Sequence, residues 1–207
     1  MIPGVDVSYV QRYPSWAAAR GTGKVQFVYA RATYGSNPAD DDGPIFAFNH
    51  DQCKQRSIPF APYTFWIAAQ DPKTQADHFL SAIDGREGDA ILMVDVEEGS
   101  GVEGWGSIQH NIEVLGQYLD IITKAICQPL IYTNADTWNT FFGGTDAFSG
   151  HKLFVASYGT TPGNPVLPNG FTDWTIHQYT SGGIVPGIPG FVDLDVLRGD
   201  LSTILRP

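Results

Sequence analysis

The chain has 207 residues, of which 43% are hydrophobic and 13% aromatic, and its formal net charge is -10 at pH 7. This length and composition predict one globular domain over residues 1–207 and exclude a disordered chain. The 12 Lys and Arg residues are scattered, so neither nucleic acid nor an anionic membrane is an expected partner. No apolar run approaches a membrane span, and nothing after Met1 resembles a signal peptide. We therefore expect a monomer without a visible export signal.

In the first half of the chain, predicted strands alternate with predicted helices. Apolar and β-branched runs predict strands over residues 2–9, 25–34 and 60–66. Helices are expected over 14–20, over 44–56, and from a cap at Asp71 followed by a proline. The turn at 37–44 contains three consecutive aspartates, which we interpret as solvated because the other ligands of a calcium site are missing.

The stretch AILMVDVEE, residues 90–98, has the pattern of a buried strand that ends in acidic residues. Because side chains alternate along a strand, Asp95 and Glu97 share one face, whereas Glu98 is directed to the opposite face or into a loop. Burying like charges side by side is costly, and one of them tends to hold its proton. A buried strand that ends in two like charges on one face indicates a functional site, although the acids could also be the solvated start of a loop. The expected faces are Ile91, Met93, Asp95 and Glu97 on one side and Leu92, Val94 and Val96 on the other.

The second half of the chain begins with a glycine-rich loop at 99–106 and a long amphipathic helix over 108–126. A strand at 128–134 and a short helix at 136–142 follow. Three further strands, at 152–159, 172–180 and 191–197, are joined by Gly- and Pro-rich loops without helical period. The pattern predicts an α/β fold of the modified TIM-barrel type, with five β/α units followed by three strands and some helices missing.

In such a barrel the functional side chains stand at the C-terminal ends of the strands. Carboxylates combined with tyrosines on one rim favour a sugar site, because aromatic rings stack on pyranoses while carboxylates transfer protons. Trp66 is a further candidate for a sugar contact, although a tryptophan is at least as often a packing residue. The expected rim residues are Asp6, Tyr63, Asp95, Glu97, Tyr132, Tyr158, Gln178 and Asp193.

Several segments together resemble the family 25 glycoside hydrolases, the Chalaropsis-type lysozymes. They are GVDVSYVQ, FVYARATYG, APYTFW, TQADHFL, VDVE, PLIYTN and WTIHQYTSGGIVPGIPGFVDLD, which run through nearly the whole chain. The resemblance implies an N-acetylmuramidase that cuts the β-1,4 bond between N-acetylmuramic acid and N-acetylglucosamine in peptidoglycan. It also implies the same barrel and no cofactor or metal.

Carried over residue by residue, the acidic site of the family falls on Asp6, Asp95, Glu97 and Asp193. Glu97 is expected to be the general acid, because neighbouring acids should raise its pKa. Asp95 would orient the 2-acetamido group of the substrate as nucleophile, or Asp6 or Asp193 would activate a water; the sequence leaves both routes open. The expected substrate-binding residues are Tyr63, Tyr132, Tyr158, Gln178 and Trp66. The chain departs from the family pattern at Arg31, Ser157 and Asp195, where Lys, Arg and Asn are common.

Two alternative functions remain at this point. A chitinase-like glycosidase would need another Asp where Met93 stands, and an inactive wall-binding barrel would have lost the acids. The expected site of action is the bacterial cell wall, reached from outside or as an endolysin released from the host cytoplasm. Cys53 and Cys127 fall in separate predicted helices with a third helix between them, so we expect two free thiols.

Overall fold

The computed structural model describes residues 1–99 and 104–206. Its strands, β1 to β8, close into one barrel in chain order. In the described part, an α-helix follows each of the first five strands. The strands are β1 (Ile2–Val7), β2 (Val28–Tyr34), β3 (Phe60–Phe65), β4 (Met93–Asp95), β5 (Leu130–Asn134), β6 (Leu153–Ala156), β7 (Ile176–Gly183) and β8 (Val192–Leu197). The helices are α1 (Trp16–Gly21), α2 (Gly43–Gln55), α3 (Pro72–Ala82), α4 (Ile108–Ala125) and α5 (Ala135–Phe141).

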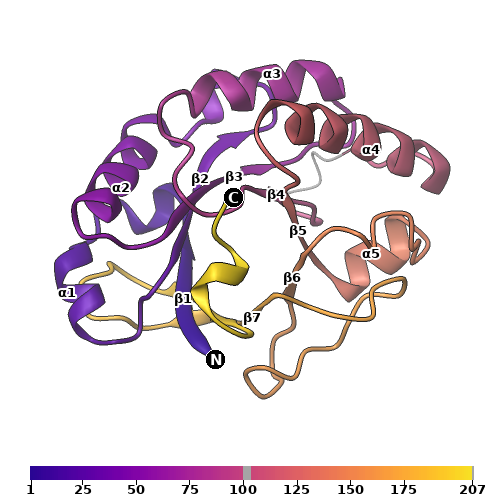
Figure 1. Cartoon of the computed structure of the whole chain (residues 1–207). Helices are drawn as coiled ribbons and strands as arrows, with labels where there is room; N and C mark the ends of the chain where they lie inside the picture. Colours follow the sequence, from indigo (N-terminus) through magenta and orange to yellow (C-terminus); the bar gives the residue numbers. More distant parts are fainter. Residues whose placement is uncertain (100–103, 207) are drawn as a thin grey trace.

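Figure 1 shows α1 to α4 as an arc around the outside of the barrel, whereas the chain from β6 onward is mostly strand and loop. This arrangement confirms the predicted fold class of five β/α units followed by three strands. Part of the loop predicted at 99–106, residues 100–103, lies outside the described residues. No helix in the described ranges is long and apolar enough to cross a membrane.

The last strand runs in the opposite direction to the others. Neighbouring strands from β1 to β7 pair in parallel, but β8 is antiparallel to both β7 and β1. The sequence did not predict this reversal. As a result, the first residues of β8 lie at the same end of the barrel as the last residues of the parallel strands.

The core has two layers separated by the strands. Inside the barrel, a cluster includes Phe27, Tyr29, Met93 and Phe154, while Val94 and its outward neighbours pack against the helices. Each fully buried large apolar side chain contributes about 1.5–3 kcal/mol relative to its exposed state. The outer layer is completed by helix residues that include Phe79, Leu115, Leu119 and Ile122.

The alternation predicted for the central stretch is confirmed. Ile91 and Met93 belong to the inner cluster, and Leu92, Val94 and Val96 belong to the outer one. The regular strand is shorter than predicted, because its beginning pairs with the C-terminal segment: Ala90 bridges to Leu205, and the Ile91 N–H donates to the Ile204 carbonyl at 2.7 Å.

The expected cap at Asp71 and the two free thiols are also confirmed, whereas the first α-helix begins at Trp16 and not at Pro14. The side chain of Asp71 accepts a hydrogen bond from the Thr74 N–H at 2.8 Å, which caps the first turn of α3. Both cysteines are free, with Cys53 buried in α2. Cys127 lies just beyond the end of α4 and not within it as predicted, and it is only half-buried.

Candidate active site

Three carboxyl groups lie near one another at one end of the barrel. They belong to Asp6 in β1, Asp95 in β4 and Asp193 in β8. Asp6 stands directly opposite Asp193 in the antiparallel register. We predicted Asp193 as a residue at the end of its strand, which is wrong: it lies near the start of β8 and reaches the rim because that strand is reversed. Asp6 and Asp95 are each only 5% exposed, so this is a buried acidic cluster.

Burial is the main cause of the raised pKa values of these groups. It raises the pKa of Asp6, with a further increase from the charge of Asp193, and it raises the pKa of Asp95, with a further increase from Glu97. It also raises the pKa of Asp193 to about 6. The cluster therefore retains protons at a pH at which exposed carboxyls are ionised.

A chain of hydrogen bonds holds Asp6 in place. The Gln178 amide donates from Nε2 to Asp6 Oδ2 at 2.6 Å. The amide oxygen accepts from the hydroxyls of Tyr132, at 2.8 Å, and Tyr158, at 2.5 Å. Because both tyrosines donate to Oε1, the orientation of the amide is fixed with its NH2 group toward Asp6. Three of the predicted rim residues thus form one network around a fourth.

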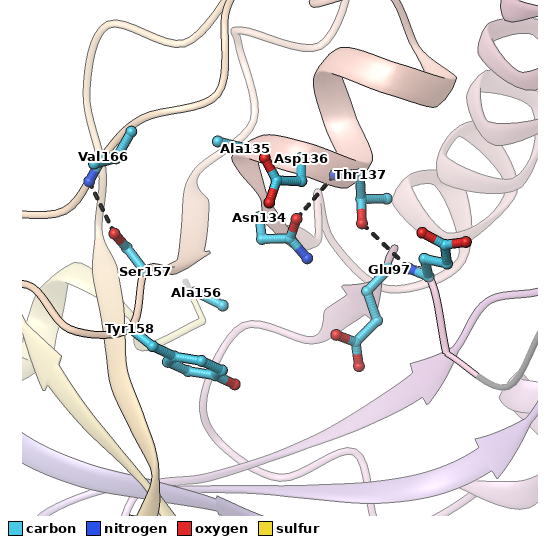
Figure 2. Close-up of a pocket in the computed structure, with 10 residues that line it drawn as sticks. Glu97, Asn134, Ala135, Asp136, Thr137, Ala156, Ser157, Tyr158 and Val166 are labelled. Carbon is cyan, nitrogen blue, oxygen red and sulfur yellow. Dashed lines mark hydrogen bonds between the residues drawn. The ribbon is translucent and has the colours of Figure 1, made fainter.

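One pocket, of about 550 Å³, opens beside Glu97 (Figure 2), whose charge acts on both Asp6 and Asp95. Glu97, Asn134, Ser157 and Tyr158 lie around this opening. Asn134 also caps α5, since its side chain accepts from the Thr137 N–H at 2.9 Å. The wall is largely polar, which suits the hydroxyls and amides of a sugar chain.

Glu97 is half-buried, whereas the next residue, Glu98, is exposed at the edge of the first pocket. The backbone N–H of Glu98 donates to Thr137 Oγ1 at 3.2 Å. Glu97 also lines a second pocket, of about 830 Å³, that extends toward β2 and β3. A polymer lying across both pockets would therefore pass over Glu97.

The second pocket has an aromatic wall and one buried cation. The rings of Tyr34 and Phe65 are stacked, with centroids 4.5 Å apart, and Arg31 lies over the ring of Tyr9 at 5.1 Å. Sequence reasoning missed the stacked pair, although both residues end neighbouring parallel strands and stand in register. Tyr63 and Asp95 line this pocket as well.

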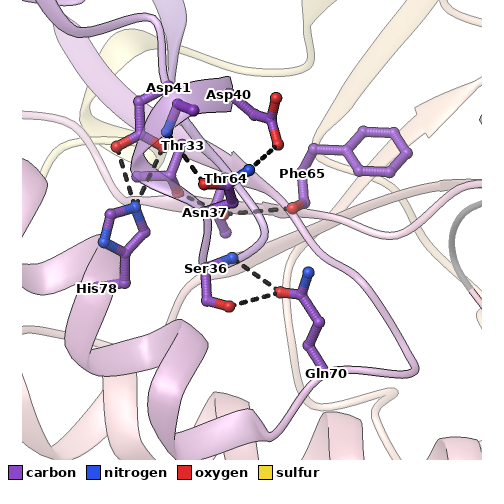
Figure 3. Close-up of polar contacts among 10 residues, drawn as sticks. Thr33, Ser36, Asn37, Asp40, Asp41, Thr64, Phe65, Gln70 and His78 are labelled. Atoms are coloured by element: carbon purple, nitrogen blue, oxygen red, sulfur yellow. Dashed lines mark hydrogen bonds and ion pairs between the residues drawn. The ribbon is translucent and has the colours of Figure 1, made fainter.

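The turn with three aspartates borders the second pocket and is less solvated than predicted. Asp42 is buried and pairs with Arg31 at 2.7 Å, and Asp41 pairs with His78 in α3 at 2.9 Å. Only Asp40 is exposed; it accepts from Asn37 Nδ2 at 2.8 Å. Figure 3 shows His78 facing Asp41, and Gln70 accepting a hydrogen bond from the Ser36 N–H. Two of the three aspartates therefore have partners from distant segments, and one of these partners, Arg31, is a permanent cation.

The sequence model described as Glycosyl hydrolases family 25 matches residues 5–188. The chain belongs to this family. Lysozyme M1 of Streptomyces globisporus is 29% identical over 212 residues, covering 99% of this chain and 70% of the relative. The N,O-diacetylmuramidase of Chalaropsis sp is 28% identical over 210 residues, covering 93% of this chain and 96% of the relative. Among solved structures, the bacterial lysozyme of Streptomyces coelicolor has a TM-score of 0.85 and 27% identity, and the match covers 98% of this chain and 94% of that one.

One predicted sugar contact of this family 25 glycoside hydrolase is not part of the site. Trp66 is 0% exposed and packs in the outer layer near Trp105, with ring centroids 6.1 Å apart. It follows Phe65, which faces the second pocket, so alternation directs Trp66 away from the barrel axis. The prediction that Trp66 binds substrate is therefore wrong.

Proposed function

We propose that the protein is a lysozyme that hydrolyses the β-1,4 bond between N-acetylmuramic acid and N-acetylglucosamine in bacterial peptidoglycan. The observation that carries this proposal is the position of Glu97, which lines both pockets at the edge of a buried acidic cluster in a family 25 barrel. A glycan strand seated in both pockets would present a glycosidic oxygen to this carboxyl group.

In this proposal Glu97 is the general acid that protonates the leaving oxygen. Asp95 and Glu97 act on one another electrostatically, and two like charges so close do not both ionise readily. The carboxylates of Asp6, Asp95 and Asp193 would then stabilise the positive charge that develops on the sugar ring. A water molecule completes the hydrolysis, and its oxygen ends on the new reducing end.

The tyrosines divide into two groups in this proposal. Tyr63 and Tyr158 line the pockets and contact the sugars, while the Tyr158 hydroxyl proton is donated to Gln178. Tyr132 and Gln178 are only 5% and 2% exposed, so they hold Asp6 and Tyr158 in position. The partner is the glycan strand of the wall, and the bacterial cell wall is the site of action.

The test is digestion of purified peptidoglycan and, in parallel, of chitin, with the products identified by mass spectrometry. The proposal expects new reducing-end muramic acid from peptidoglycan, released by the wild type and lost in Glu97→Gln. Reducing-end glucosamine from peptidoglycan, preferential cleavage of chitin, or no release would overturn it. The chitinase alternative is disfavoured because Met93, where the additional acid would stand, is an apolar residue buried inside the barrel.

A further inference from the structure

Asp195 is a buried acid to which the proposed reaction assigns no role. It lies in β8 opposite Gly4 of β1 and Gln178 of β7, and it is 0% exposed. Among the described residues, neither of its carboxyl oxygens has a hydrogen-bond donor. An ionised carboxylate without donors is strongly disfavoured in such surroundings, whereas the neutral acid is not.

The groups around Asp195 do not stabilise a negative charge. Asp6 from β1 and Asp193 from β8 repel it, and together with burial they raise its pKa. Tyr29 from β2 and Tyr179 from β7 are close enough that the charge of Asp195 raises their own pKa values, after the effect of burial. The charges of Asp6 and Asp193 therefore favour the protonated form of Asp195, while the neutral Tyr29 and Tyr179 give its carboxyl oxygens no hydrogen bond that would offset this effect.

The contact between Asp195 and Asp6 decides which of the two holds a proton. Two carboxylates are both acceptors, so a hydrogen bond between them requires a proton on one. Asp6 already accepts from Gln178 Nε2 at 2.6 Å, which favours its ionised form. Burial has the largest effect on both groups and raises both pKa values. The contact between the two acids then lowers the pKa of Asp6 and raises the pKa of Asp195 further.

We propose that Asp195 is a positioning residue: it remains a protonated carboxylic acid and donates its O–H to Asp6, so that Asp6 accepts hydrogen bonds from both Asp195 and Gln178. The catalytic consequence rests on the proposed function, in which Asp6 acts as a carboxylate near the sugar. The protonation itself does not. A donor at position 195 fixes the direction of the Asp6 carboxylate and keeps that group ionised at a lower pH.

The first test uses thermal melting of wild type and Asp195→Asn as a function of pH. The amide keeps a donor toward Asp6 but cannot ionise. A carboxyl that stays protonated in the folded state and ionises when unfolded loses stability as pH rises from its unfolded pKa, about 3.9, to its raised folded pKa. We therefore expect the Tm of the variant relative to wild type to increase from about pH 4 to neutral pH.

Infrared spectroscopy supplies a second readout without substrate. At neutral pH, the difference between wild type and Asp195→Asn should contain the C=O stretch of one protonated carboxylic acid. A difference band of an ionised carboxylate, or a Tm difference that does not change with pH, would overturn the proposal. Neither measurement depends on activity, so an inactive wild type would refute the proposed function and leave this inference standing.

The positioning role is tested by the pH profile of cleavage. Asp195→Ala removes the donor, so the pKa of Asp6 should rise and the acid limb of the profile should move to higher pH. Asp195→Asn should restore the limb to its wild-type position, because its amide replaces the O–H. Equal profiles for Asp195→Ala and wild type, with both folded by melting, would exclude the positioning role.

Discussion

Gln178 donates to Asp6 across a hydrogen bond of 2.6 Å, although the two residues are 172 positions apart in the chain. The bond joins β7 to β1 inside the barrel. Because two tyrosine hydroxyls fix the orientation of the Gln178 amide, they also fix the direction from which it donates to Asp6. Three strands and the segment after β6 thus cooperate to orient one oxygen atom of Asp6.

Replacing Gln178 by Leu should lower kcat by about 10-fold or more, because a hydrogen bond to a charged group contributes about 1.5–3 kcal/mol. The amide lowers the pKa of Asp6, so its loss should also move the acid limb of the rate profile to higher pH. Steady-state rates of peptidoglycan cleavage across pH measure both effects. Gln117→Leu, the same change on the exposed face of α4, is the control and should leave the profile unchanged.

The pH dependence of the wild type should be bell-shaped. Burial raises the pKa of Asp193 to about 6 and that of Asp6 well above its usual value, so activity should rise with pH as these carboxyls ionise. Activity should fall again when the general acid loses its proton. The measurement is kcat/KM from about pH 4 to about pH 9. A rate that stays constant far into the alkaline range would contradict a carboxylic general acid.

The barrel and the direction of the central acids follow from local pattern. Alternation along residues 91–96 separates inner from outer side chains, and the structure keeps that separation. The same rule would have assigned Trp66 to the outer layer, since it follows the inward Phe65. The error came from treating a tryptophan at the end of a strand as a sugar contact without applying this rule.

Other features depend on contacts that no local pattern contains. The direction of β8 is set by its pairing with both β7 and β1, and an alternating strand has the same pattern in either direction. Asp42 is buried beside Arg31, and the half-buried Asp41 pairs with His78 in α3. The sequence of the turn is uniformly polar and does not show which acids are paired, because their partners lie in other elements.

The ion pair between Arg31 and Asp42 provides a stability prediction. The two side chains are 12% and 2% exposed, and Asp42 accepts from both Nε and an Nη of the guanidinium, at 3.1 and 2.7 Å. Asp42→Asn leaves a largely buried cation without this partner and should cost about 3 kcal/mol of unfolding free energy. Asp40→Asn, an exposed neighbour in the same turn, should change it by less than about 0.5 kcal/mol.

Urea unfolding of both variants, followed by circular dichroism, measures this difference. The denaturant slope should be unchanged, since neither substitution alters the surface that becomes exposed on unfolding. Equal stability of Asp42→Asn and Asp40→Asn would mean that the pair is compensated by solvent and contributes little to the fold.

The assignment of the general acid depends on two adjacent glutamates. Glu97 lines both pockets and acts electrostatically on Asp95, whereas Glu98 is exposed and lines only the first pocket. Glu97→Gln keeps the shape and polarity of the side chain but cannot supply a carboxylic proton, so kcat should fall by roughly 10²-fold or more. Glu98→Gln should leave kcat close to wild type, because it removes an exposed charge away from the acidic cluster.

Both glutamate variants should remain folded, since neither removes buried apolar volume and an exposed charge change alters stability by at most about 0.5 kcal/mol. Thermal melting establishes this before rates are compared. Solubilisation of purified peptidoglycan by equal amounts of folded protein then separates the two residues. An inactive Glu98→Gln beside a nearly normal Glu97→Gln would move the proton donor to Glu98. In that case the glycan would lie in the first pocket alone, because Glu97 is the acid that connects the two.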